Sequence, residues 1–110
     1  MNVQIFGSAK SFDSKKAERY FKERNIKYQY IDIRKYGISR GELQSVKSAV
    51  GLDRLIDQSN QDSVIIRYLS SEDDKFEKLY ENQEWISLPI VRNGKAATVG
   101  YAPEVWKNWK

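Results

Sequence analysis

The first thirty-two residues combine two short strand-forming segments and an amphipathic helix, in an order that restricts the fold. The segment 3–6 is mostly apolar, and the segment 28–32 is aromatic and β-branched at alternating positions. Between the two segments, apolar residues recur at helical spacing, at Ala17, Tyr20 and Phe21. This spacing predicts a helix from about Asp13 or Ser14 to Asn25. Because two strands joined through a helix run parallel, the sequence predicts an α/β fold that begins with a β–α–β unit.

The middle of the chain contains several helix signals. Ser39 and Glu42 have the spacing of a capping box, which predicts a helix that ends at Gly51. The residues that follow, as far as position 70, are ambiguous, since the apolar run 64–66 favours a strand when it is taken alone. Apolar residues at helical spacing predict a further helix over about 73–81.

The last third of the chain predicts a hairpin and a final helix. The β-forming segments 88–92 and 95–99 flank Asn93–Gly94, a pair that is typical of a tight two-residue hairpin turn. Pro103 then stands in the first turn of the final helix. Together with the parallel first pair, this antiparallel hairpin completes a mixed four-stranded sheet flanked by helices.

The composition limits the chemistry of any site. The chain has 110 residues and contains no Cys and no His. This length fits one domain, residues 1–110. Without thiolate or imidazole ligands we expect no zinc, copper or haem site, and the predicted metal and cofactor content is none.

The distribution of apolar and charged residues indicates the environment of the protein. Apolar stretches are only a few residues long, so no membrane span is expected. The segment 1–6 lacks the basic and apolar regions of a secretory signal, which favours a cytoplasmic location. The net charge of +4 comes from nineteen Lys and Arg interspersed with fifteen Asp and Glu. This pattern is typical of a solvated surface and predicts no direct binding of nucleic acid.

The loop between the first strand and the first helix carries polar side chains with two possible roles. Ser11 and Ser14 are placed to cap the helix. Alternatively, the free N–H groups at the helix start, together with Lys10, Lys15 and Lys16, form a site for a phosphate or a carboxylate. The sequence leaves both interpretations open.

Three segments occur in an order that is typical of one protein family. They are Ile5–Ala17, which spans the loop, Leu88–Val91 (Leu-Pro-Ile-Val) and Val99–Tyr101 (Val-Gly-Tyr). Over essentially the whole chain, the sequence resembles the arsenate reductases coupled to glutaredoxin or thioredoxin, a family that includes the Spx-type transcriptional regulators. The resemblance implies a thioredoxin-like fold with a helical insertion over about 38–82. It also implies that residues 62–69 are helical, against their strand propensity.

The resemblance assigns two roles to the start of the third strand. In a thioredoxin-like fold, the bond between Leu88 and Pro89 is expected to be cis, which turns the backbone toward the loop after the first strand. The exposed backbone at Leu88 is then a candidate for pairing with an extended peptide by strand addition.

The resemblance also implies that the family's chemistry has been lost. Ser11 takes the place of the thiolate nucleophile, and Ser14 stands at the second loop position. A serine hydroxyl is un-ionised near neutral pH and needs an adjacent base, and the chain has no His. The family's arginines that hold the oxyanion are also replaced. Leu88 stands in place of one, and Asp57 in place of another, where it reverses the charge. Lys15 replaces a third and keeps the positive charge, but it lacks the bidentate hydrogen-bonding geometry of a guanidinium. The chain is therefore predicted to be a non-catalytic binding or regulatory protein.

Three alternatives remain. The first is an Spx-type regulator that contacts RNA polymerase, for example through its α-subunit. The second is a glutathione-dependent enzyme in which the Ser11 hydroxyl activates the thiol. The third applies if Ser11 and Ser14 replace natural cysteines, in which case the chain is an arsenate reductase-like oxidoreductase. The predicted partner is accordingly a protein, a small anion or glutathione.

Overall fold

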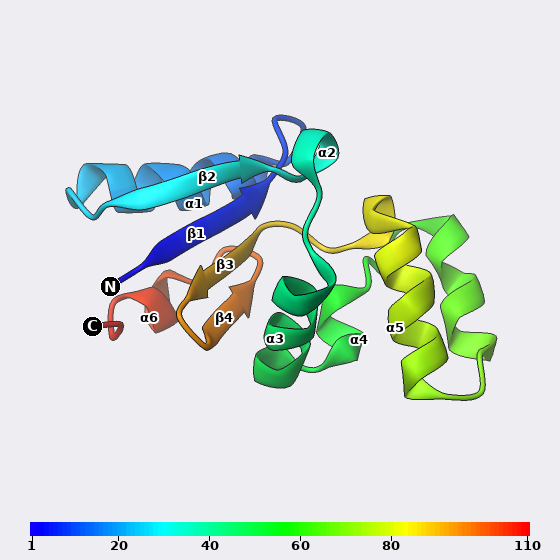
Figure 1. Ribbon diagram of the computed structural model, residues 1–110. Coiled ribbons are helices and arrows are strands. Elements are labelled where there is room, and N and C mark those ends of the chain that lie inside the picture. Colours follow the sequence, from blue (N-terminus) through cyan, green and yellow to red (C-terminus); the bar gives the residue numbers. More distant parts are fainter.

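The four strands form one mixed sheet in the order β2-β1-β3-β4 (Figure 1). The computed structural model describes residues 1–110. Strand β1 (Val3–Gly7) runs parallel to β2 (Tyr28–Asp32) and antiparallel to β3 (Ile90–Asn93), which pairs with β4 (Ala96–Val99). This arrangement confirms the predicted parallel pair, the hairpin and the mixed α/β sheet.

The turn of the hairpin lies one residue later than predicted. Asn93 pairs with Ala96, so the two turn residues are Gly94 and Lys95. Gly94 has a φ of +62°, and Lys95 has no positive φ. This is the pattern of a type II′ turn, which places Gly first. Asn93 instead ends β3, and its side-chain oxygen accepts a hydrogen bond from the backbone N–H of Asn2 at 3.0 Å.

The two faces of the sheet pack on two separate apolar cores. Helices α1 (Phe12–Glu23) and α6 (Pro103–Trp106) cover one face, where Trp106 packs against Phe21 with ring centroids 5.1 Å apart. The indole N–H of Trp106 donates to the hydroxyl of Thr98 at 2.7 Å. On the other face, Phe6 and Ile90 join a larger core built from the helical segment.

Between β2 and β3 the chain forms only helices. They are α2 (Ile33–Tyr36), α3 (Arg40–Val50), α4 (Leu52–Leu55), the 3₁₀-helix η1 (Gln61–Tyr68), α5 (Glu72–Glu81) and the 3₁₀-helix η2 (Gln83–Trp85). The predicted capping box is present at the start of α3, where Ser39 and Glu42 each accept a hydrogen bond from the other's backbone N–H. None of the helices of the structure, including the twelve-residue α1, has the length and apolar character needed to cross a membrane.

Residues 61–68 are helical, as the family resemblance implied, and do not form the strand that the apolar run 64–66 favours when it is taken alone. The segment is a 3₁₀-helix, with three residues in each turn. Ser63 and Ile66 are therefore on the same side and are buried, whereas Val64 and Ile65 are exposed. Burial of Ile66 in the core therefore outweighs the strand propensity of the apolar run 64–66.

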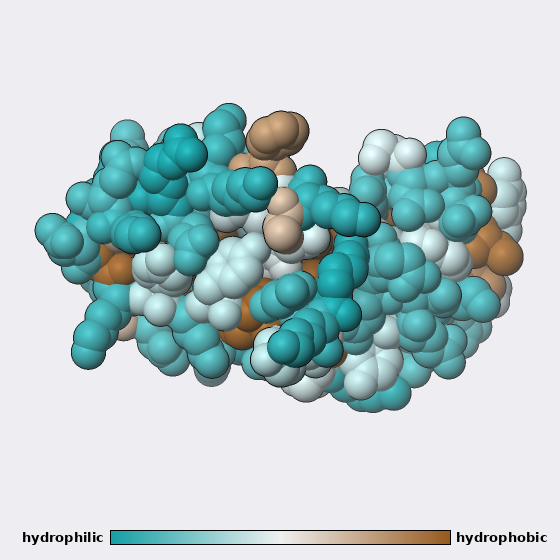
Figure 2. Space-filling model, turned by 90° about the horizontal axis from the view of Figure 1, so that it is seen from above, coloured by the Kyte–Doolittle hydropathy of each residue, from teal (hydrophilic) through white to brown (hydrophobic).

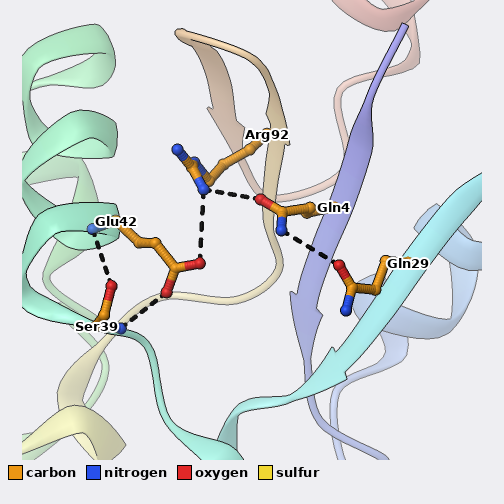
Figure 3. A network of polar contacts seen from close by, with 5 residues as sticks. All are labelled: Gln4, Gln29, Ser39, Glu42 and Arg92. Atoms are coloured by element: carbon orange, nitrogen blue, oxygen red, sulfur yellow. Dashed lines mark hydrogen bonds and ion pairs between the residues drawn. The ribbon is translucent and has the colours of Figure 1, made fainter.

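The molecule has two ends, which we call the sheet lobe (residues 1–37 and 86–110) and the helical lobe (residues 38–85). Its principal extents are 43 × 26 × 24 Å, and Figure 1 shows the sheet with α1 and α6 at one end and α3, α4 and α5 at the other. Arg92 of β3 connects the two lobes (Figure 3). It donates to Gln4 at 2.7 Å and forms an ion pair with Glu42 at 3.7 Å.

Gly7 is the last residue of β1 and has no room for a side chain. A Cβ at this position would lie 2.7 Å from the Tyr30 hydroxyl oxygen and 2.8 Å from the Ser14 Cβ. The start of α1 therefore packs directly on the backbone of β1, and this contact sets the position of the intervening loop.

We expect Gly7→Ala to lower the free energy of unfolding by about 1–3 kcal/mol, because overpacking a tight site displaces its neighbours. Gly41→Ala is the matched control, since Gly41 lies in α3 with nothing within 4 Å of its would-be Cβ. We expect this control to be neutral or to stabilise by up to about 1 kcal/mol, because Ala has the higher helix propensity. Urea denaturation of both variants measures the difference, and equal effects would contradict the packing argument.

Candidate functional site

A pocket of about 650 Å³ lies where the ends of β1 and β2 meet the helical lobe. The segment after β1, the start of α2 and the segment before β3 all contribute to its wall. The lining residues are Ser8, Ala9, Lys10, Ser11, Asp32, Arg34, Asp57, Ile86 and Leu88. Figure 2 shows that the molecular surface is notched between its two ends, and that the face in view is mostly hydrophilic.

Ser11 is the N-cap of α1. Its hydroxyl oxygen accepts a hydrogen bond from the backbone N–H of Ser14 at 3.1 Å, and its own N–H donates to the carbonyl of Ser8 at 3.0 Å. The helix thus begins at Phe12, slightly earlier than predicted, and ends at Glu23. Ser11 is half-buried and lines the pocket. The same residue therefore caps α1 and forms part of the pocket wall.

Ser14 and Lys15 do not face the pocket. Ser14 is fully buried, and its hydroxyl oxygen accepts a hydrogen bond from the backbone N–H of Ser8 at 3.3 Å. It therefore holds the loop in place and does not cap the helix. Lys15 is exposed on α1 and is not part of the pocket wall, whereas Lys10 is. The structure thus separates the predicted residues into a pocket pair, Lys10 and Ser11, and three residues outside the pocket, Ser14, Lys15 and Lys16.

Tyr30 lies beside the buried Ser14 and stays protonated at neutral pH. Burial raises the pKa of Tyr30, the carboxylates of Glu18 and Asp32 raise it further, and the Ser14 hydroxyl opposes the shift. Tyr30 is consequently unable to serve as a general base near pH 7. The Ser11 hydroxyl makes no hydrogen bond to a carboxylate of the pocket either.

The pocket carries two groups of each charge. Lys10 and Arg34 supply the positive charges, and Asp32 and Asp57 the negative ones. The Asp57 carboxylate is held by Ser59, whose backbone N–H and hydroxyl donate to it at 3.0 and 2.6 Å. Asp57 and Leu88, the two replacements expected from the family resemblance, therefore lie in one pocket with Ser11.

Sequence reasoning missed Arg34. This residue lies in α2, a one-turn helix that was not predicted and that Asp32 caps by accepting a hydrogen bond from the Arg34 N–H at 3.0 Å. The Arg34 guanidinium donates to the carbonyl of Gln83 at 3.1 Å. The only local signal was an Asp two residues before the Arg, at the end of a strand.

The backbone of Leu88 is free in the pocket wall. The bond between Leu88 and Pro89 is cis, as predicted. Pro89 is buried, and its carbonyl accepts a hydrogen bond from Gly100 at 2.8 Å. The N–H and C=O of Leu88, by contrast, make no hydrogen bond within the chain. These two groups remain available to a ligand that approaches as an extended chain.

The sequence matches no protein-family model, and no curated protein matches it either. Solved structures do match in fold. An arsenate reductase from Vibrio cholerae superposes with a TM-score of 0.82 at 22% identity, covering 96% of this chain and 94% of that one. A Bacteroides fragilis protein described as ArsC family related gives a TM-score of 0.81 at 20% identity, covering 100% and 98%.

An arsenate reductase related protein from Brucella melitensis is also similar, with a TM-score of 0.67 at 19% identity over 99% of this chain and 94% of that one. At these identities the likeness concerns the fold. The chain has the thioredoxin-like fold of the arsenate reductases, and its pocket holds Ser11 at the start of α1.

We expect a Ser11→Cys variant to have a thiol pKa at least about one unit below the ordinary value of about 8.5, because the N-terminus of α1 stabilises a thiolate. The pH dependence of alkylation by iodoacetamide measures this pKa. Ser48→Cys is the matched control, since Ser48 is exposed near the C-terminal end of α3, where the helix dipole disfavours an anion. If the thiol pKa of the Ser11→Cys variant equals or exceeds that of the control, the N-terminus of α1 does not act on this position.

Proposed function

We propose that this chain is a non-catalytic binding or regulatory protein that has lost the reductase chemistry of the arsenate reductases whose fold it shares. The single observation that carries the proposal is the composition of the pocket. Ser11 occupies its helix N-terminus, and Asp57 and Leu88 lie in its wall. A nucleophile of low reactivity is thus combined with a reversed charge in the oxyanion region.

The absence of a thiol supports the loss of redox chemistry. Arsenate reduction and disulfide exchange both proceed through a bond to sulfur, which a serine cannot form. The Ser11 hydroxyl accepts the helix-capping hydrogen bond and has no imidazole or ionised tyrosine beside it. Activation as an alkoxide nucleophile would require such a base.

The electrostatics of the pocket disfavour a bare oxyanion. Two unit charges of like sign about 6 Å apart repel by roughly 3 kcal/mol at an effective dielectric constant of 20. An arsenate dianion attracted by Lys10 and Arg34 would meet this repulsion from Asp32 and Asp57. Neither carboxylate forms an ion pair within the chain that would reduce it.

The same charges favour a ligand that carries both an amine and a carboxylate. Such a ligand satisfies both charge signs of the pocket, and the free backbone groups of Leu88 can pair with an extended chain. A short peptide has this combination of features. We therefore propose a peptide-like, dipolar ligand rather than an inorganic anion.

Glutathione and arsenate are suitable probes for an NMR titration of the native protein. We expect glutathione to shift the amide signals of residues 8–11, Arg34 and Leu88, and arsenate to leave them unchanged. Arg34→Ala should weaken glutathione binding about tenfold, because it removes a charge-assisted contact. Arg67→Ala, an exposed change in η1, serves as the control and should leave the binding unchanged.

Two results would contradict the proposed function. Thiol-dependent reduction of arsenate by the native protein would contradict the proposed loss of chemistry. Tighter binding of arsenate than of glutathione would contradict the proposed ligand class. Either result leaves the fold assignment intact.

A further inference from the structure

The fold separates charges that are interspersed along the sequence. The sheet lobe contains thirteen Lys and Arg and five Asp and Glu, whereas the helical lobe contains six and ten. Their formal net charges are therefore +8 and −4. Because the molecule is elongated, with the lobes at its two ends, it presents a basic end and an acidic end.

The basic groups of α1 are free of intramolecular ion pairs. The three ion pairs of the structure all use glutamates of the helical lobe, namely Glu42, Glu72 and Glu77. Lys15, Lys16 and Arg19 are exposed on α1, and none of them has a carboxylate within ion-pair distance. Both lysines precede Arg19 by three or four residues, so the three cations share one side of the helix.

Two exposed aromatic rings continue this basic surface. Phe12 is 83% exposed and stands one helical turn before Lys16. Tyr101 is 41% exposed, and the Lys16 ammonium lies 5.0 Å from the centroid of its ring. We call the surface formed by Phe12, Lys15, Lys16, Arg19 and Tyr101 the α1 face. None of these residues lines the pocket at Ser11.

We propose that the α1 face docks an acidic polypeptide segment that carries apolar or aromatic side chains among its carboxylates. The unpaired cations complement the carboxylates, and Phe12 and Tyr101 provide the apolar contact that anchors such interfaces. Helix α1 is about 18 Å long, which matches five or six residues of extended chain. The proposal goes beyond the pocket function and does not depend on it.

A nucleic acid fits this surface less well. Asp13 and Glu18 lie on the same helix and would repel a dense row of phosphates. A nucleic acid carries a charge on every nucleotide and cannot avoid these two carboxylates. A polypeptide segment can place apolar side chains opposite them and in contact with Phe12 and Tyr101, which are exposed.

A random copolymer of L-glutamate and L-tyrosine is a defined probe for this surface. We expect it to bind the native protein at low salt and to shift the amide signals of residues 12–19 and Tyr101. Poly-L-glutamate should bind several-fold more weakly, because it lacks the aromatic groups. Binding should weaken as salt rises, since the Debye length falls from about 10 Å at 0.1 M to about 3 Å at 1 M.

Paired charge reversals test the location of the binding surface. Lys15→Glu with Arg19→Glu should weaken binding of the copolymer by at least about tenfold. Arg54→Glu with Arg67→Glu makes the same change in net charge on exposed residues of the helical lobe, and should change binding less than about twofold. Phe12→Ala should reduce the binding of the copolymer and leave that of poly-L-glutamate unchanged.

Three outcomes would overturn the proposal. They are equal losses in the two double variants, amide shifts confined to the helical lobe, and tighter binding of a single-stranded oligonucleotide of equal charge than of the copolymer. The titration with glutathione separates this proposal from the pocket function. The Lys15→Glu, Arg19→Glu variant should bind glutathione as the native protein does, whereas Arg34→Ala should bind the copolymer normally.

Discussion

The contact between the backbone of Gly7 and the first turn of α1 determines the geometry of the whole site. Ser14 is fully buried there, and its hydroxyl oxygen accepts a hydrogen bond from the backbone N–H of Ser8. The start of the loop at Ser8 and the first turn of α1 at Ser14 are therefore both fixed beside Gly7, the last residue of β1. This attachment places Ser11 at the helix N-terminus and in the pocket wall at the same time. The hydroxyl group of Tyr30, on β2, packs against Gly7 as well. The loop position is therefore a consequence of packing beneath it, and it does not require a sulfur atom at position 11.

The position of the loop is consequently set by the packing of Gly7, Ser14 and Tyr30. A thiol-dependent reductase needs a thiolate nucleophile, whereas the loop of this chain is held by the buried Ser14 and the backbone of Gly7 and Ser8. In this chain the sheet, the capping hydrogen bond of Ser11 and the pocket are all present, with Asp57 and Leu88 in the pocket wall. The pocket carries both charge signs, since Asp57 and Asp32 line it together with Lys10 and Arg34. These charges are the basis of the proposed binding of a ligand that carries both signs.

The predictions from the sequence succeeded where the signal was local. The capping box at Ser39, the second strand and the β–α–β order all depend on neighbouring residues, and all are present. The hairpin was predicted with its turn one residue early, because an Asn-Gly pair suits a turn type that the chain does not adopt. Helix η1 required knowledge of the family, since its strand propensity is overridden by the burial of Ile66. Arg34 was missed because its place in the pocket depends on how α2 sits against residues about fifty positions away.

The separation of charge between the lobes shows most directly why a sequence pattern can mislead. Along the chain, cations and carboxylates alternate closely, and the interspersed pattern indicates an ordinary solvated surface. The sheet lobe, however, is assembled from both ends of the chain, while the helical lobe is the continuous middle. Folding therefore gathers the basic N-terminal and C-terminal segments at one end and leaves the acidic insertion at the other. The ion pair between Arg92 and Glu42 lies where the two regions meet (Figure 3). Lys15, Lys16 and Arg19 of α1 lie in the sheet lobe and form no ion pair within the chain.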